Sequence, residues 1–237
     1  MLTATIRVSA KSAVKNKSLY TLYFILYTST PMRLPFALLA LAGALTVSAQ
    51  LTAESAFTSA PAEVFPLLER NSRLDMIDYF RSGLDTPTAN RLDGGSRVTA
   101  LSDSKMDLNL SDASSAHIVL LPAGSDTIIA VVNTLAMPGK DSSVSFYSPQ
   151  WKKLSGENIF KAPTMDDWMT KGHSTREVTD VTPFMIASIT IDPAAGSLTV
   201  NNNLSAFLAP EVYESIAPAM MPQLTYKWDG RRFRPAH

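Results

Sequence analysis

The chain of 237 residues contains no cysteine. Disulfide bonds therefore contribute nothing to its stability, and thiolate metal sites and cysteine nucleophiles are excluded. A lipid anchor attached to a cysteine behind a bacterial signal sequence is excluded for the same reason. The chain has only three histidines, His117, His173 and His237, and no two of them have the spacing of zinc ligands. The sequence thus predicts no metal and no other cofactor.

Long apolar runs are also missing, since the run over residues 19–27 is far shorter than the roughly 20 residues that cross a bilayer. Residues 32–49 instead have the three parts of a secretory signal peptide: a positive start at Arg33, a short apolar stretch, and a small-residue cleavage site ending at Ala49. Cleavage near Ala49 would leave Gln50 as the first mature residue. We therefore expect an exported protein, periplasmic or extracellular, with no stable membrane anchor after cleavage.

Residues 1–31 precede this signal, although a signal peptide normally begins at the initiator. We interpret them as a start codon assigned too early or as an extended positive n-region, and an uncleaved membrane anchor remains an alternative. The expected mature chain, residues 50–237, is long enough for one domain. Two small subdomains, 50–150 and 184–237 joined by 151–183, are the other possibility.

An excess of positive charge is lacking in the mature chain. Residues 1–49 hold five basic residues and no acid, so residues 50–237 carry 16 basic and 21 acidic side chains, a net charge of −5. Nucleic-acid binding requires clustered cations on a basic domain. The composition therefore argues against a nucleic-acid partner.

The start of the mature chain has helical periodicity. A first helix is predicted around residues 61–68, with a break or kink at Pro66. A firmer helix is predicted over residues 73–82, with Ser72 as its N-cap and Gly83 as a left-handed C-cap.

From Arg97 onward the apolar period falls from 3.6 to two, which indicates strands. Short loops between consecutive strands require antiparallel pairing, so the segment is predicted to be a meander. Its strands are expected at residues 106–110, 117–121, 127–133 and 144–147. The fold class is therefore α+β, an antiparallel meander and hairpins with a few short helices packed on the sheet.

The region beyond the meander is predicted to contain a long connection and a hairpin. The connection covers residues 149–183 and has one short helix at 166–170. A hairpin with strands at 185–191 and 198–200 follows, and a short helix starts at Pro210.

A second hairpin is predicted where the alternating run ending at Trp228 meets Asp229-Gly230, the favoured pair for a two-residue type I′ turn. That register would set Trp228 opposite Arg231 and Tyr226 opposite Phe233. Aromatic pairing and a cation–π contact would then both be available on one face.

Several motifs together resemble one known family. In order along the chain, they are Asn71–Asp78, Gly94–Asp103, Val131–Thr134, Ser143–Tyr147 and the closing run Leu224–Gly230. The chain is similar, over nearly all of its mature part, to an uncharacterised secreted family of Bacteroidetes, domain of unknown function 3256 (DUF3256). The resemblance implies a small exported protein and implies no activity, cofactor or site residue.

The sequence contains little that points to catalysis, since no Gly-x-Ser-x-Gly nucleophile elbow is present. Glycosidases need two carboxylates set a few ångströms apart. Asp166 and Asp167, beside Trp168 in the long connection, are the only weak catalytic candidates, and they would imply a glycan-directed hydrolase.

A non-enzymatic binding or accessory module of the periplasm or cell envelope is the favoured hypothesis, because aromatic residues and arginine dominate recognition surfaces. Candidate binding residues are Trp151, Trp168, Tyr226, Trp228 and Arg231. The partner is expected to be an envelope protein or a glycan, and an inhibitor or assembly factor that presents its sheet is a further alternative. The sequence leaves the oligomeric state open.

Overall fold

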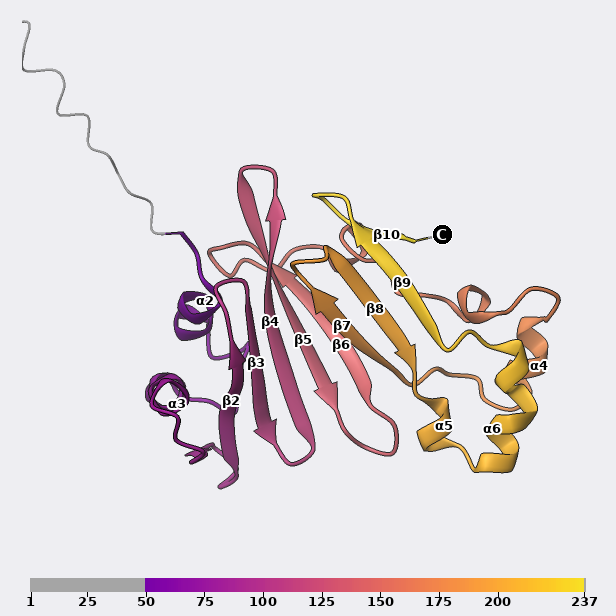
Figure 1. Ribbon diagram of the computed structural model, residues 1–237, viewed down its shortest axis with the longest axis horizontal. Coiled ribbons are helices and arrows are strands. Elements are labelled where there is room, and N and C mark those ends of the chain that lie inside the picture. The colour runs from indigo at the N-terminus through magenta and orange to yellow at the C-terminus, as the bar shows by residue number, and fades with distance from the viewer. Residues whose placement is uncertain (1–49, 237) are drawn as a thin grey trace, which may run out of the picture. The chain divides into compact units, whose positions relative to one another are not determined.

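The computed structural model describes residues 50–236, which contain two antiparallel sheets and several short helices (Figure 1). The larger sheet has six strands in chain order, β1 (Thr88–Ala89), β2 (Gly95–Leu101), β3 (Lys105–Ser111), β4 (Ser114–Ala123), β5 (Asp126–Leu135) and β6 (Asp141–Tyr147). The smaller sheet has the order β10 (Phe233–Pro235), β9 (Gln223–Trp228), β8 (Ser197–Asn202) and β7 (Ala187–Asp192). The predicted α+β class and the meander are confirmed.

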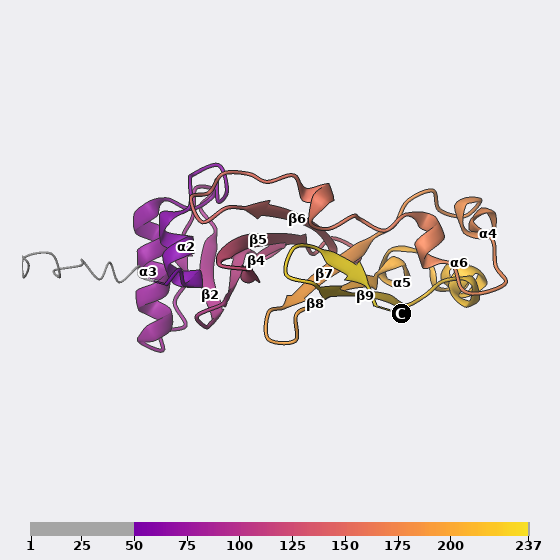
Figure 2. The same ribbon diagram turned by 90° about the horizontal axis from the view of Figure 1, so that it is seen from above.

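Alternation along the strands divides the apolar residues between two cores. In β4, Ala116, Ile118 and Leu120 lie on one face of the sheet, and Val119 and Leu121 lie on the other. The first face forms the helix-side core, whose largest buried residues include Phe57, Phe65, Leu68, Met76, Met106, Leu108, Ile118 and Ile129. The second face packs on the smaller sheet and forms the inter-sheet core, which includes Val119, Leu121, Phe146, Phe160, Trp168, Ile189, Leu198 and Tyr226. Figure 2 shows the smaller sheet as a second layer beside β4, β5 and β6.

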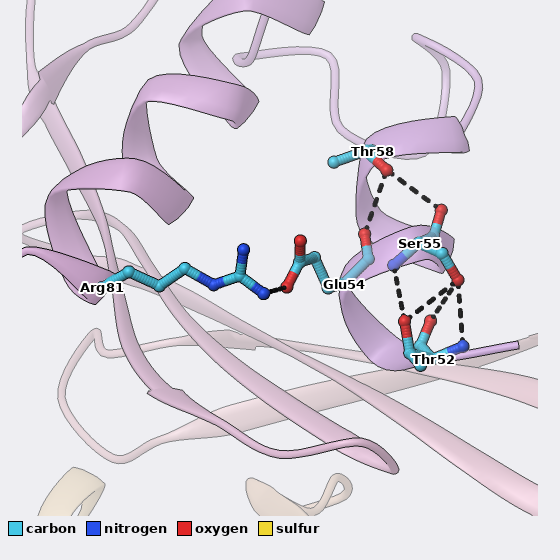
Figure 3. A network of polar contacts seen from close by, with 5 residues as sticks. All are labelled: Thr52, Glu54, Ser55, Thr58 and Arg81. Carbon is cyan, nitrogen blue, oxygen red and sulfur yellow. Dashed lines mark hydrogen bonds and ion pairs between the residues drawn. The ribbon is translucent and has the colours of Figure 1, made fainter. Parts of the chain in front are cut away.

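The helix α2 (Ala53–Ser59) begins at a capping box. The Ser55 N–H donates to Thr52 Oγ1 at 3.1 Å, and the Thr52 N–H donates to Ser55 Oγ at 2.9 Å (Figure 3). Arg81, in the last turn of the next helix, pairs with Glu54 and ties the two helices together (Figure 3).

The predicted helix around residues 61–68 was wrong. The helical segment lies before Pro61 instead, and turns occupy residues 62–67. A residue that precedes proline is pushed out of the α region, and Ala60 accordingly has ψ of 137°. The helix therefore ends at Ser59.

The second helix, α3 (Arg70–Arg81), begins three residues earlier than predicted. Glu69 is its N-cap and forms no side-chain cap, so Ser72 lies inside the first turn rather than before it. At the other end Gly83 has φ of 67°, and its N–H donates to the Phe80 carbonyl at 3.1 Å. The predicted left-handed cap at Gly83 is confirmed.

The long connection between β6 and β7 has little regular structure. It contains two 3-10 helices, η1 (Gly156–Asn158) and η2 (Met165–Trp168), and one short helix, α4 (Thr175–Thr179). The helix expected at residues 166–170 is thus a 3-10 turn that begins and ends slightly earlier. After β8 follow α5 (Leu204–Phe207), α6 (Pro210–Ile216), with proline in its first turn as expected, and η3 (Ala217–Ala219). Figure 1 shows α4, α5 and α6 together at the opposite end of residues 50–236 from α2 and α3.

The β9–β10 hairpin differs from its prediction, because four residues, 229–232, join its strands. Phe233 rather than Arg231 pairs with Trp228, and their rings lie 4.9 Å apart. The Asp229 carboxylate accepts the N–H groups of Arg231 and Arg232, each at 2.9 Å, which stabilises the longer loop. The predicted two-residue turn and its register were wrong.

Within residues 50–236 no helix has both the length and the apolar character needed to cross a bilayer.

Candidate functional site

The loop of the β9–β10 hairpin carries a cluster of cationic side chains. Arg231, Arg232 and Arg234 line a cavity of about 510 Å³ together with Asp229 and, from η1 and its end, Asn158 and Ile159. All three arginines are exposed. We call this cavity the arginine pocket.

The arginine pocket has a firm base. The Phe233 N–H donates to the Ile159 carbonyl at 2.8 Å, which joins the hairpin to the long connection. On the other strand, Trp228 Nε1 donates to the Pro122 carbonyl at 2.7 Å, which joins the hairpin to the larger sheet. Residues that position guanidinium groups on a well-held loop reduce the conformational entropy lost when a ligand binds.

One carboxylate lies among the three arginines. The hydrogen bond from Arg234, 2.5 Å long, lowers the pKa of Asp229 to about 2, and backbone N–H donors contribute to the same shift. Asp229 is therefore ionised at neutral pH, and three arginines and one aspartate leave the pocket a net charge of +2.

The three arginines differ in how far Asp229 occupies them. Arg234 bonds directly to Asp229, and Arg232 lies 4.0 Å from the same carboxylate. Among the described residues Arg231 forms no ion pair, so its guanidinium is the one available to an incoming anion. A guanidinium presents donors in a planar fork that fits carboxylate, phosphate or sulfate groups.

The aromatic residues predicted to bind a partner lie mostly inside the two cores. Trp168 is 1% exposed and Tyr226 is 6% exposed, both in the inter-sheet core. Trp151 is buried in the helix-side core, with φ of 61° and its Nε1 3.3 Å from Ser59 Oγ. Trp228 is half-buried and packs against the inter-sheet core. Of the five candidates, only Arg231 is exposed.

The weak catalytic candidates both make local hydrogen bonds. Asp167 accepts from the Thr164 N–H at 2.6 Å and from the Thr164 hydroxyl at 2.8 Å, which closes the start of η2. Asp166 accepts from the Thr175 hydroxyl at the start of α4. Both aspartates are exposed and stabilise turns of the connection, and a catalytic role for them stays a prediction.

A second cluster of titratable groups lies on β3 and β4. His117 Nδ1 lies 2.7 Å from Asp107 Oδ1, and Lys105 Nζ lies 3.2 Å from the same oxygen. Burial raises the pKa of Asp107, but its hydrogen bond with His117 and its interactions with His117 and Lys105 outweigh burial and hold the pKa below its usual value. In the described residues the His117 ring bonds to Asp107 and to no serine hydroxyl. His117 is half-buried in β4.

Within residues 50–236, no three His, Asp or Glu side chains lie close enough together to hold a metal ion.

Sequence reasoning missed Arg232, Arg234 and Asn158. The run Arg-Arg-Phe-Arg at residues 231–234 is the densest group of cations in residues 50–237, which are acidic overall, and this was the available signal. Asn158 and Ile159 carried no signal, because the tertiary hydrogen bond to Phe233 brings them to the pocket from more than seventy residues away.

No curated protein matches the chain. Among solved structures, a domain of an uncharacterized protein from Porphyromonas gingivalis W83 is similar, with a TM-score of 0.66 and 23% sequence identity, and the match covers 77% of this chain and 98% of that one. This likeness shows the fold. The family described as "Protein of unknown function (DUF3256)" matches residues 44–233, so the chain belongs to that family.

Proposed function

We propose that this protein is an exported, non-enzymatic binding or accessory module of the periplasm or cell envelope, and that the arginine pocket is where it binds. The ligand would be an anionic group on an envelope glycan or protein. The observation that carries the proposal is the arrangement of three exposed guanidinium groups around one cavity with a single carboxylate among them.

The positive charge of the arginine pocket contrasts with the net negative charge of the chain around it. The mature chain carries a net charge of −5, so general attraction to anions does not explain a local charge of +2. Asp229 satisfies Arg234 and the loop backbone, and it leaves Arg231 without an ion pair among residues 50–236. A carboxylate-bearing or sulfated chain supplies the complementary negative charge. Each charge-assisted hydrogen bond that it accepts contributes about 1.5–3 kcal/mol to binding.

The test measures binding of polygalacturonate, heparin oligosaccharides and neutral dextran to the protein by isothermal titration calorimetry. We expect at least one anionic glycan to bind and dextran not to bind. Arg231→Ala should weaken the binding about tenfold, which corresponds to one lost charge-assisted contact.

The matched control is Arg176→Ala, which removes an exposed arginine of α4, far along the chain from the hairpin, that pairs only loosely with Asp180 at 3.7 Å. It should leave binding unchanged. Equal weakening by both substitutions would reduce the interaction to general charge attraction, and binding of neither anionic glycan would remove the glycan form of the proposal.

The proposed export has a separate test in N-terminal sequencing of the protein recovered from cells. A mature start at Gln50 is expected, whereas a start well upstream would contradict the cleaved signal peptide.

A further inference from the structure

The strand β6 forms one edge of the larger sheet, and only part of that edge is covered. Residues 152–154 lie beside the end of β6, where the Leu154 N–H donates to the Phe146 carbonyl and the Ser148 N–H donates to the Lys152 carbonyl, each at 2.9 Å. The bridge between Tyr147 and Lys153 is antiparallel. The chain thus starts a seventh strand and leaves the edge at η1 after these few residues.

The two bonds also show which backbone groups of β6 point away from the sheet. In an antiparallel strand the N–H and C=O of one residue point to the same side, and successive residues alternate. Phe146 and Ser148 bond outward, so Ser142 and Val144 point outward as well, while Ser143 and Ser145 point to β5. Among the described residues, no backbone group bonds to the outward N–H and C=O of Ser142 and Val144.

A groove of about 700 Å³ runs beside this open edge. Its apolar part consists of Val144 and Phe146 from β6, Phe160 from the connection, and Ile189 from β7, the edge strand of the smaller sheet. The opposite wall is the segment 156–162, which includes Glu157 and Lys161 of opposite charge. The groove therefore combines unpaired strand backbone with an apolar floor between two sheet edges.

We propose that this groove binds an extended peptide segment, which adds to β6 as a further antiparallel strand in line with residues 152–154. Backbone hydrogen bonds to Ser142 and Val144 would hold the peptide. Its alternate side chains would be apolar and would lie on Val144, Phe160 and Ile189, because the side chains of paired strands share a face. The five residues 141–145 extend about 17 Å, which suits a peptide of five to seven residues.

An extended peptide fits this groove better than a glycan or a small molecule. Its regular spacing of donors and acceptors matches the open edge, and the lining carries no excess charge that would select a charged ligand. The groove adjoins the arginine pocket and shares Asn158 with it, but Arg231 does not line the groove, so Arg231→Ala should leave peptide binding unchanged.

The probe is the capped heptapeptide acetyl-Ser-Val-Thr-Val-Ser-Val-Lys-amide. Its binding is measured by ¹H–¹⁵N NMR of the protein. We expect shift changes at residues 142–146 and 156–162. In the antiparallel arrangement the valine N–H groups face β6 while the serine and threonine N–H groups face away. A peptide N-methylated at its valines should therefore bind at least tenfold more weakly, and one N-methylated at its serines and threonine should bind within about threefold of the parent.

Two pairs of protein variants complete the test. Val144→Pro removes an outward N–H, at an edge position where proline is tolerated, and should abolish binding, whereas Val144→Thr keeps the N–H and should bind. If Val144→Pro fails to fold by circular dichroism, the decision passes to the exposed groove residue Ala162. Ala162→Trp should block binding, and Ala113→Trp, at an exposed turn outside the groove, should not.

Three outcomes would overturn the proposal. They are no binding at millimolar peptide, equal binding of both N-methylated peptides, and self-association of the chain through β6 that the peptide does not displace.

Discussion

The two cores of this protein are closed in different ways. The helix-side core is covered by a continuous stretch near the start of the described chain, α2, the following turns and α3, and it encloses the buried Arg73. The inter-sheet core draws on residues from Val119 to Phe233, so distant segments meet at its margins. The arginine pocket and the β6 groove both lie at those margins, where Phe160 or its neighbours contribute to each. Both proposed binding surfaces therefore border the core that is assembled from distant segments, whereas one continuous stretch of chain covers the other core.

Replacing the tryptophan of each core should give the largest effect. Trp168 is 1% exposed in the inter-sheet core, whereas Trp151 is 9% exposed at the edge of the helix-side core. We expect Trp168→Ala to lower the free energy of unfolding by about 3–5 kcal/mol. Trp151→Ala should cost less, because Trp151 is the more exposed of the two residues. Urea unfolding followed by fluorescence measures both, and a larger loss for Trp151→Ala would contradict the comparison.

The buried Arg73 offers the next test, now of the helix-side core. Its Nη1 donates to the Phe57 carbonyl at 2.8 Å and to the Ala60 carbonyl at 2.7 Å, and burial lowers the pKa of its guanidinium, with a contribution from Arg70. Arg73→Ala leaves two buried carbonyls without this donor, so we expect a loss of about 2 kcal/mol in the free energy of unfolding.

Arg81→Ala is the matched control on the same helix. Arg81 is exposed and pairs with Glu54, and a surface pair of this kind contributes less than about 1 kcal/mol. Equal losses for the two variants in urea unfolding would show that Arg73 contributes no more than a surface residue. Arg73 would then not be an important link between α3 and the carbonyls at the end of α2.

The strands could be predicted because alternation and short loops are properties of neighbouring residues. The runs around Met106, Ile118 and Ile129 place every second side chain in one core, and no tertiary information is needed to see this. The cap at Gly83 was predictable for the same reason, since a left-handed residue after a helix favours glycine.

The features that failed depend on competing local bonds or on distant contacts. The Asp229 side chain binds two backbone N–H groups and so favours a four-residue loop over the type I′ turn that Asp229-Gly230 indicates. Arg231 was predicted from its residue type, but its neighbours in the pocket follow from the bond between Phe233 and Ile159. The β6 groove requires the chain to leave the edge at Gly156, and no pattern in the sequence signals that departure.

The smallest expected effect concerns Asp229, at the margin of the inter-sheet core. Its pKa of about 2 lies below the ordinary 3.8, so its contribution to stability is present above about pH 4 and is lost as the pH falls through 2. Asp229→Asn keeps an oxygen that accepts the loop N–H groups but removes the charge that Arg234 binds. The wild type should therefore be more stable than Asp229→Asn above pH 4, and the difference should shrink as the pH falls toward 2. Glu177, whose pKa is also about 2 because of its bond with His173, is present in both proteins and cancels. Urea unfolding of both proteins between pH 2 and 6 measures this difference in the free energy of unfolding. A difference that does not change with pH would mean that the geometry of the loop, and not the charge of Asp229, stabilises the hairpin. It would contradict the role that the ionised Asp229 has in the arginine pocket.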